Sequence, residues 1–333
     1  MKFFGILPLF GLVAPSLGHY VISNFIVNGK ESPMGRCMRM PESTDPLKDL
    51  YSSNMACNIN GDKGVARVCD IKAGDTITLI WRDHPDGYQA GSLPSGSHDG
   101  PCAAYLKHFP SNNVANSAAS GGGWFKIMED GYSGGQWCSE KIRNNGGKMT
   151  VKIPTDLKAG QYLLRGEHIA LHEPVPQFYV GCVQLVISSA GQKTAPSTVS
   201  IPGHMTPDQV AYDFWKGDNK RPKSYTIPGN AKLFNPPANN SPIPSPLLKQ
   251  TGFDNCIETN ANWCAKPVPK FTNTDGCWKA ANDCWTQSRA CFGSAPISGN
   301  KGCFAYEENK CKAAQRHCEG CGSSSCKPFT FTI

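Results

Sequence analysis

The chain has 333 residues, of which 39% are hydrophobic and 18% charged, with 34 glycines and 26 prolines. This length holds one large domain and a smaller one, and the abundant turn formers favour β architecture over helical bundles. The net charge of +7 comes from scattered Lys and Arg residues, which excludes a concentrated nucleic-acid-binding surface. After the N-terminal region, no stretch approaches the roughly 18 apolar residues of a membrane span.

Residues 1–18 have the pattern of a secretory signal peptide. Lys2 precedes an apolar run, and Ser16 and Gly18 are the small residues that signal peptidase requires. We therefore expect a secreted, extracellular protein whose mature chain begins at His19. A free α-amino group titrates at roughly pH 8, so the amine and the imidazole of this residue can chelate one metal ion.

Residues 19–192 have the composition of a β domain. Alternating or β-branched runs predict strands at 19–27, 75–81, 103–107, 149–153, 161–165 and 177–188. Several short strands with long connections indicate a β-sandwich of immunoglobulin-like type. We expect segments 83–97 and 110–146 to be loops on that scaffold, where functional residues commonly lie.

The sequence changes character at about residue 193. Aromatic residues up to Phe234 suggest continued packing on the sandwich, so the predicted sandwich domain spans residues 19–234. Residues 235–253, which include a Pro-, Asn- and Ser-rich run, are expected to form a linker. Asn239 begins a glycosylation sequon, with Pro242 directly after it.

Sixteen cysteines behind a signal sequence indicate an oxidising compartment and disulfide bonds. Ten of them lie in residues 254–333, where a seven-residue spacing recurs in two sets: Cys277, Cys284 and Cys291, and Cys311 and Cys318. Seven residues are two helical turns, so each set lies along one helix face, and disulfides can join two such helices. We predict a disulfide-rich, helical C-terminal domain at 254–333. The alternative is metal binding by Cys318 and Cys321, against which the even cysteine count argues.

Residues of the sandwich supply candidate partners for the amine and imidazole of His19. His98 is followed at once by a Gly-Pro turn, which holds it at the start of a strand. His172 precedes Gln177 and Tyr179, which point the same way on a strand. One amine and two imidazoles in a plane, with a weak axial oxygen, favour copper over zinc, calcium or magnesium. Four other histidines lack this framing and are expected to be solvated or internally paired: His84, His108, His204 and His317.

Several motifs follow one another in a fixed order along this region. They are His19-Tyr20, 66–70 (Ala-Arg-Val-Cys-Asp), 73–76 (Ala-Gly-Asp-Thr), His98-x-Gly-Pro-x-x-x-Tyr105, 123–127 (Gly-Trp-Phe-Lys-Ile), 160–165 (Gly-Gln-Tyr-Leu-Leu-Arg), 169–172 (Ile-Ala-Leu-His), Gln177-x-Tyr179 and 200–203 (Ser-Ile-Pro-Gly). Together they resemble the fungal lytic polysaccharide monooxygenases of auxiliary activity family 9, once classed as glycoside hydrolase family 61.

The resemblance implies that His19 and His98 bind one copper ion that cycles between Cu(II) and Cu(I). Tyr179 would be its axial ligand, while His172 and Gln177 would position the co-substrate, O2 or hydrogen peroxide. An external electron donor would act as the reductant. The implied activity is oxidative cleavage of the β-1,4-glycosidic bonds of cellulose or a related insoluble glucan by a monomeric enzyme without nucleic-acid or membrane partners.

The resemblance also places a disulfide at Cys57 and Cys182, and Trp215 where many family members have a substrate-stacking tyrosine. Tyr20, Trp215 and Tyr225 are the predicted substrate-binding aromatics, since a flat aromatic face suits a crystalline polymer. The spacer between His172 and Gln177 is shorter than in many members. Pairing stays open for the remaining sandwich cysteines: Cys37, Cys69, Cys102 and Cys138.

Three alternatives remain. A glycoside hydrolase needs two carboxyl groups across the scissile bond, and Glu167 in the 166–172 motif has no obvious partner. A chitin-directed enzyme fits the resemblance less closely. A non-catalytic, secreted copper- or carbohydrate-binding protein with the same fold would need the two ligand histidines but not His172, Gln177 and Tyr179, all of which are present.

Overall fold

The structure, a computed structural model, describes residues 19–86, 98–195, 197–229, 231–234, 255–322 and 325–328. The predicted signal peptide (1–18), the predicted linker (235–253) and the sequon at Asn239 lie outside these residues. The strands of the main body are β1 (Val21–Val27), β2 (Lys30–Glu31), β3 (Met38–Arg39), β4 (Cys69–Lys72), β5 (Thr76–Arg82), β6 (Cys102–Phe109), β7 (Gly121–Asp130), β8 (Tyr132–Ser133), β9 (Gln136–Trp137), β10 (Lys148–Lys152), β11 (Gly160–Ala170), β12 (Gln177–Ser188) and β13 (Val199–Ile201). Its helices are α1 (Cys138–Asn144) and α2 (Pro207–Val210), with single 3₁₀ turns at Ser53–Met55 and Val114–Asn116.

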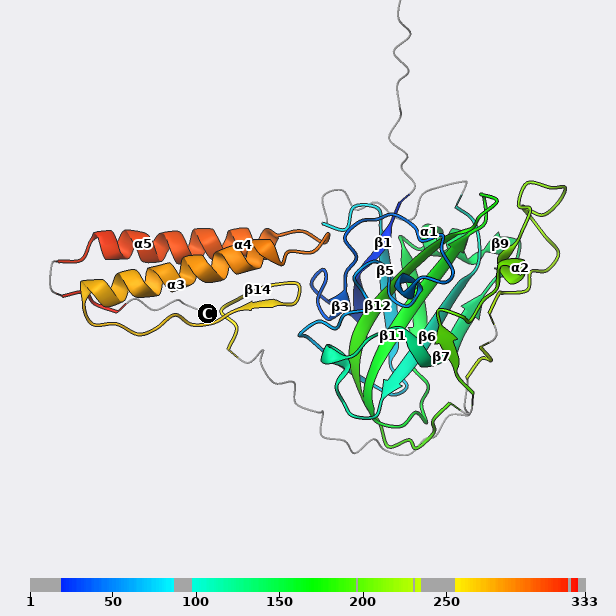
Figure 1. Ribbon diagram of the computed structural model, residues 1–333, viewed down its shortest axis with the longest axis horizontal. Helices are drawn as coiled ribbons and strands as arrows, with labels where there is room; N and C mark the ends of the chain where they lie inside the picture. Colours follow the sequence, from blue (N-terminus) through cyan, green and yellow to red (C-terminus); the bar gives the residue numbers. More distant parts are fainter. Residues whose placement is uncertain are drawn as a thin grey trace, which may run out of the picture.

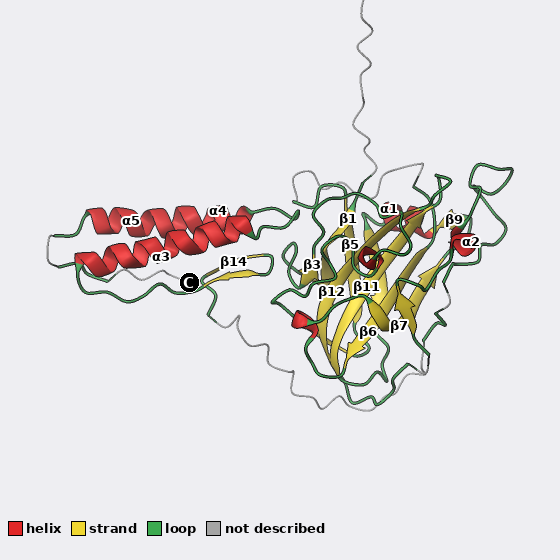
Figure 2. Cartoon of the chain, viewed as in Figure 1, coloured by secondary structure: helices red, strands yellow, loops and turns green. Residues whose placement is uncertain are grey.

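The long strands form two facing sheets, as Figures 1 and 2 show. One sheet has the order β10-β5-β1-β2 and the other β13-β7-β6-β11-β12-β3, with β4 added in parallel beside β12. Every other pairing between the strands of these sheets is antiparallel. The predicted β-sandwich is therefore confirmed.

Apolar side chains that alternate along the strands fill the space between the sheets, among them Ile22, Leu79 and Val183. At Gly166 on β11 the sheets approach so closely that a Cβ atom would lie 2.6 Å from Leu79 and 2.8 Å from Ile22. Only glycine fits there without a shift of the core. This packing fixes where β1 crosses β11, and with it where the chain enters β1.

The six predicted strand runs are all found, but the prediction of a loop at 110–146 is wrong. That segment contains α1 and β7, and β7 pairs with β6 on one side and β13 on the other. Strand β7 begins with three glycines, of which Gly121 and Gly123 have positive φ values of 91° and 96°. Glycine weakens the β signal of a sequence, so the run does not look like a strand.

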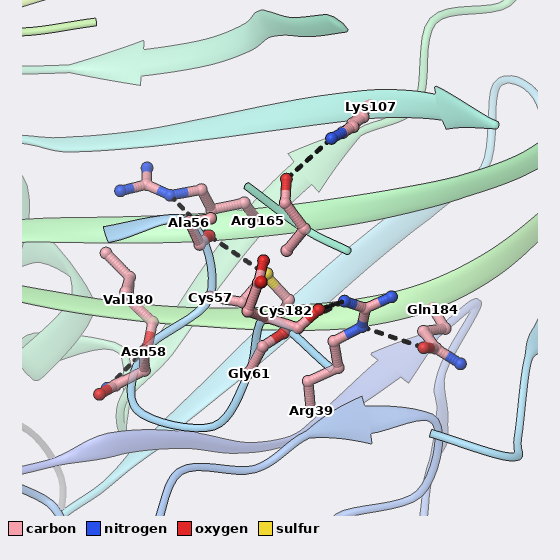
Figure 3. Close-up of a disulfide and its surroundings, with 12 residues drawn as sticks. Arg39, Ala56, Cys57, Asn58, Gly61, Lys107, Arg165, Val180, Cys182 and Gln184 are labelled. Carbon is pink, nitrogen blue, oxygen red and sulfur yellow. Dashed lines mark hydrogen bonds between the residues drawn. A yellow bond between two sulfur atoms is a disulfide. The ribbon is translucent and has the colours of Figure 1, made fainter. Parts of the chain in front are cut away.

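Two buried arginines flank the Cys57–Cys182 disulfide (Figure 3). Arg165 donates through Nε to the Ala56 carbonyl at 3.1 Å, and Arg39 donates through Nη1 to the Gly61 carbonyl at 3.1 Å. These bonds pair loop carbonyls that are shielded from water. The predicted Cys57–Cys182 pair is thus confirmed, and the two pairs that the sequence left open are Cys37–Cys69 and Cys102–Cys138.

The C-terminal region is a helical hairpin beside a small β-hairpin, β14 (Glu258–Asn260) and β15 (Trp263–Ala265). One arm of the helical hairpin is α3 (Thr274–Gly293); the other is α4 (Lys301–Tyr306), the π-helical turn Glu307–Cys311 and α5 (Lys312–Glu319). Three disulfides join the arms. Cys277–Cys318 and Cys284–Cys311 link the two sets of seven-residue spacing, as predicted, whereas Cys291 pairs with Cys303, which lies outside both sets. Cys256–Cys264 and Cys321–Cys326 complete the set, so Cys318 and Cys321 are both disulfide-bonded rather than metal ligands. Of the helices that the structure describes, none is both long and apolar enough to cross a membrane.

Asn262 bonds the C-terminal region to the sandwich. Asn262, in the turn between β14 and β15, accepts a hydrogen bond from the Cys37 amide at 2.9 Å. Its Nδ2 donates to the carbonyl oxygens of Gly35 at 3.2 Å and Met38 at 3.0 Å. A single amide therefore pairs three backbone groups in the turn that leads into β3.

Asn262→Ala should loosen this contact, because it removes the hydrogen-bond acceptor of the Cys37 amide at a cost of about 1–3 kcal/mol. We expect the Cys37 amide to exchange its hydrogen for deuterium about tenfold faster or more, since tenfold corresponds to roughly 1.4 kcal/mol. Asn282→Ala, on the exposed side of α3, is the matched control. Unchanged exchange at Cys37 would show that Asn262 does not hold the contact.

Candidate active site

The β11–β12 hairpin positions the first group of candidate residues. Its register places Tyr179 opposite His168 and Gln177 opposite Ala170. His172 follows β11 directly, at the end of the hairpin where Gln177 begins β12. The hairpin therefore brings His172, Gln177 and Tyr179 to one end of the sandwich.

The segment before β6 brings His98 to the same end. The Leu171 amide donates to the Asp99 carbonyl at 3.0 Å, which joins residues 98–101 to the end of β11. Gly100 permits this approach, because a Cβ atom there would lie 1.8 Å from the Ile169 carbonyl oxygen. As a result the His98 ring lies 4.2 Å from the His172 ring and 6.1 Å from the Tyr179 ring, centroid to centroid.

Tyr20 anchors the start of β1 beneath this group. Its ring stacks on Tyr179 with 3.9 Å between centroids, its hydroxyl hydrogen-bonds Nδ1 of His168, and its exposed fraction is 0%. The prediction that Tyr20 belongs to an exposed substrate-binding face is therefore wrong. Its role is structural, because this packing sets the position of the adjacent residue, His19.

His19 is partly exposed and lies beside the cluster. Its Nδ1 is 2.9 Å from Oδ1 of Asp45, a partner that sequence analysis did not identify. Burial, followed by the neighbouring imidazoles of His172 and His19, lowers the pKa of His98 to about 4. His98 is thus neutral at physiological pH, the form in which an imidazole binds a metal.

A chain of hydrogen bonds runs from Tyr179 to the protein surface. The Tyr179 hydroxyl donates to Oε1 of Gln177 at 2.8 Å, and Nε2 of Gln177 donates to Oε1 of Glu173 at 2.9 Å. The other carboxylate oxygen of Glu173 accepts from Nζ of Lys48 at 2.6 Å. Sequence analysis missed Glu173 and Lys48, because nothing in their spacing connects residue 48 to the 171–176 loop.

Of the three predicted substrate-binding aromatics, only Trp215 is exposed, at 59%. Its Nε1 donates to the His172 carbonyl at 2.8 Å, which ties the indole to the residue beside the site. Tyr225 is partly buried, with its ring packed edge-on against Trp137 at 5.0 Å and Tyr212 at 5.1 Å. Among these three residues, an outward-facing ring next to the histidine cluster is supplied by Trp215.

Residues 19–225 match the family model described as "Auxiliary Activity family 9 (formerly GH61)". The chain belongs to auxiliary activity family 9. It is 37% identical over 326 residues to an "AA9 family lytic polysaccharide monooxygenase H" of Botryotinia fuckeliana, an alignment that covers 91% of this chain and 73% of the relative. It is 35% identical over 333 residues to an "AA9 family lytic polysaccharide monooxygenase C" of Aspergillus tamarii, covering 93% of this chain and 88% of the relative.

Among solved structures, the sandwich is similar to a "Cellulose-active Polysaccharide Monooxygenase from M. thermophila" with a TM-score of 0.55 and 26% identity. That alignment covers 65% of this chain and 99% of the other. As a member of auxiliary activity family 9, the chain is a lytic polysaccharide monooxygenase, an oxidoreductase that cleaves polysaccharides oxidatively.

Proposed function

We propose that this family 9 protein is a secreted, copper-dependent monooxygenase that cleaves the β-1,4-glycosidic bonds of cellulose or related glucans. The observation that supports this most is one cluster of side chains from four separate segments. His98, His172 and Tyr179 lie together, and Tyr20 stacks on Tyr179 so that His19 is adjacent. Secretion and cleavage after Gly18 are part of the proposal, because they free the amine of His19.

The donor set suits copper. His19 and His98 would hold the ion through two imidazoles and the freed amine, with the Tyr179 oxygen as a further, weaker ligand. The low pKa of His98 keeps its imidazole unprotonated, and burial raises the pKa of Tyr179, so its phenol keeps a proton. Copper, once bound, would supply one-electron redox chemistry with an external reductant and O2 or hydrogen peroxide.

The residues around the proposed ligands would orient them and donate hydrogen bonds to the co-substrate. Tyr179 donates its proton to Oε1 of Gln177, and its oxygen would bind a metal through a lone pair. His172, whose ring lies 4.2 Å from that of His98, and Gln177 are the proposed hydrogen-bond donors to the oxygen co-substrate. These side chains would give the bound ion its position and its electrostatic surroundings.

An exposed aromatic side chain next to the site supports the choice of a glucan as substrate. Trp215 is exposed beside His172, and Nζ of Lys220 lies 5.1 Å from the centre of its ring. An exposed indole stacks on the face of a sugar ring, whereas a crystalline polymer cannot enter a deep pocket. The similar M. thermophila enzyme is described as cellulose-active, which points to the same substrate class.

We also propose that the chain is divided into a sandwich domain at 19–234, a linker at 235–253 and a C-terminal domain at 254–333. All five disulfides of the cysteines after residue 255 close within that region. Asn239 remains a proposed glycosylation site. A monomer is the proposed active form, with no nucleic-acid or membrane partner.

The decisive experiment is incubation of the secreted protein with cellulose, copper and ascorbate, followed by mass spectrometry of the soluble products. We expect oxidised cello-oligosaccharides that disappear when either copper or reductant is left out. Products that form without a reductant would indicate a hydrolase. Copper binding without any product from cellulose or other glucans would favour a non-catalytic copper- or carbohydrate-binding protein.

A further inference from the structure

The Gln177 amide lies between the Tyr179 hydroxyl and the Glu173 carboxylate. At one end, Oε1 accepts the Tyr179 hydroxyl proton, which an amide nitrogen could not do. At the other end, Nε2 donates to Oε1 of Glu173, which an amide oxygen could not do. A phenol oxygen can also accept a hydrogen bond, so a turned amide could still bond to Tyr179 through Nε2, but it would set its own oxygen against the Glu173 carboxylate. The carboxylate therefore selects the orientation of the amide.

Glu173 is itself held in place. Pro174 and Pro176 restrict the backbone of the short connection between His172 and Gln177. Lys48 binds the second carboxylate oxygen, and two backbone hydrogen bonds of 2.9 Å between Leu47 and Phe178 fix Lys48 beside the start of β12. The ion pair is solvent-accessible, with side chains 49% and 37% exposed, and exposed pairs contribute little stability. The effect of this ion pair is therefore to hold the Glu173 carboxylate in place rather than to stabilise the fold.

We propose that Glu173 is a positioning residue that sets the orientation of the Gln177 amide and, through it, the direction of the Tyr179 hydroxyl proton. The inference rests on the proposed function for its effect on the reaction. With Glu173 in place, Nε2 keeps a second hydrogen for a co-substrate, and the Tyr179 proton stays directed at Oε1 of Gln177. Without the carboxylate, the amide loses the partner that distinguishes its two ends.

The test compares Glu173→Ala with Glu173→Gln, which keeps one carbonyl acceptor for Nε2 of Gln177. Glu308→Ala is the matched control, because Glu308 makes a similar ion pair with Lys312 (2.7 Å) on the C-terminal hairpin. The first measurement uses copper-free, ¹⁵N-labelled protein and follows the two side-chain amide protons of Gln177, assigned with Gln177→Glu. We expect E173Q and E308A to keep both proton shifts close to those of the parent protein, and E173A to move them towards the values of a solvated glutamine amide.

The second measurement uses copper-loaded protein and records the Cu(II) electron paramagnetic resonance spectrum and the rate of product release from cellulose. E173A should change the spectrum and lower the rate about tenfold, the usual range for residues that orient a metal site, while E173Q recovers most of the rate. Gln177 amide shifts in E173A identical to those of the parent would overturn the proposal. If the amide responds but no protein releases product, the positioning role stands and the proposed function fails.

Discussion

His98→Ala is expected to lower the affinity of the mature protein for Cu(II) by more than about a hundredfold, because loss of a direct ligand exceeds the 10–100-fold cost of losing an outer partner. Of the three proposed nitrogen ligands, only the amine and the imidazole of His19 would remain. Isothermal titration calorimetry measures the affinity, and electron paramagnetic resonance reports the loss of one nitrogen ligand. Oxidised products from cellulose should fall to background.

His108→Ala is the control for this substitution. His108 lies at the far end of β6 from His98, with its ring stacked on Tyr162 at 4.7 Å, so its loss should leave copper binding unchanged. A second variant keeps one residue ahead of His19 and thereby removes the free amine without touching either imidazole. Copper affinity that survives in either His98→Ala or the extended variant would contradict the proposed ligand set.

The sequence predicts most of the sandwich because its strands are signalled locally. The run that becomes β12 (Gln177–Ser188) is matched residue for residue, since β-branched residues fill a strand buried on both faces. The run that becomes β7 is missed, because its three leading glycines carry no side chain to pack. The seven-residue spacing of cysteines in the C-terminal helices is also a local signal, so the sequence predicts these helices too.

The candidate site is only partly predicted by the sequence, because some of its residues acquire their roles through contacts with distant segments. His98 and His172 stand in motifs, and the structure places them together. Tyr20 is misassigned because an aromatic residue beside a functional one resembles a surface residue until its stacking on Tyr179, far away in sequence, is seen. Glu173 acquires its role only when Lys48 and Gln177 are brought to its two oxygens. The spacing of residues along the sequence does not reveal such contacts between distant segments.

Glu167→Gln is expected to be the most destabilising conservative change in the sandwich. Glu167 and Arg165 are adjacent on one face of β11, form an ion pair and are 1% and 0% exposed. Removing the carboxylate leaves a buried guanidinium whose charge is no longer compensated, at a cost of about 3–5 kcal/mol. Arg165 cannot turn to solvent, because it also donates to the carbonyls of Met55 and Ala56. The midpoint of thermal unfolding should fall by roughly 6–20 °C.

The pH dependence of this effect gives a sharper test than its size. Burial raises the pKa of Glu167, but Arg165 and His204 outweigh it and hold the pKa at about 2, against 4.5 for an unperturbed glutamate. The carboxylate therefore contributes stability that is fully present above about pH 4.5 and is lost as the pH falls towards 2; at 1.36 kcal/mol per unit this amounts to about 3 kcal/mol. The difference in melting temperature between the parent and Glu167→Gln should accordingly narrow over that acid range, whereas Glu42→Gln, at an exposed carboxylate, should match the parent throughout. A difference that stays constant from pH 7 to pH 3 would mean that the ionised form of Glu167 is not what stabilises the fold.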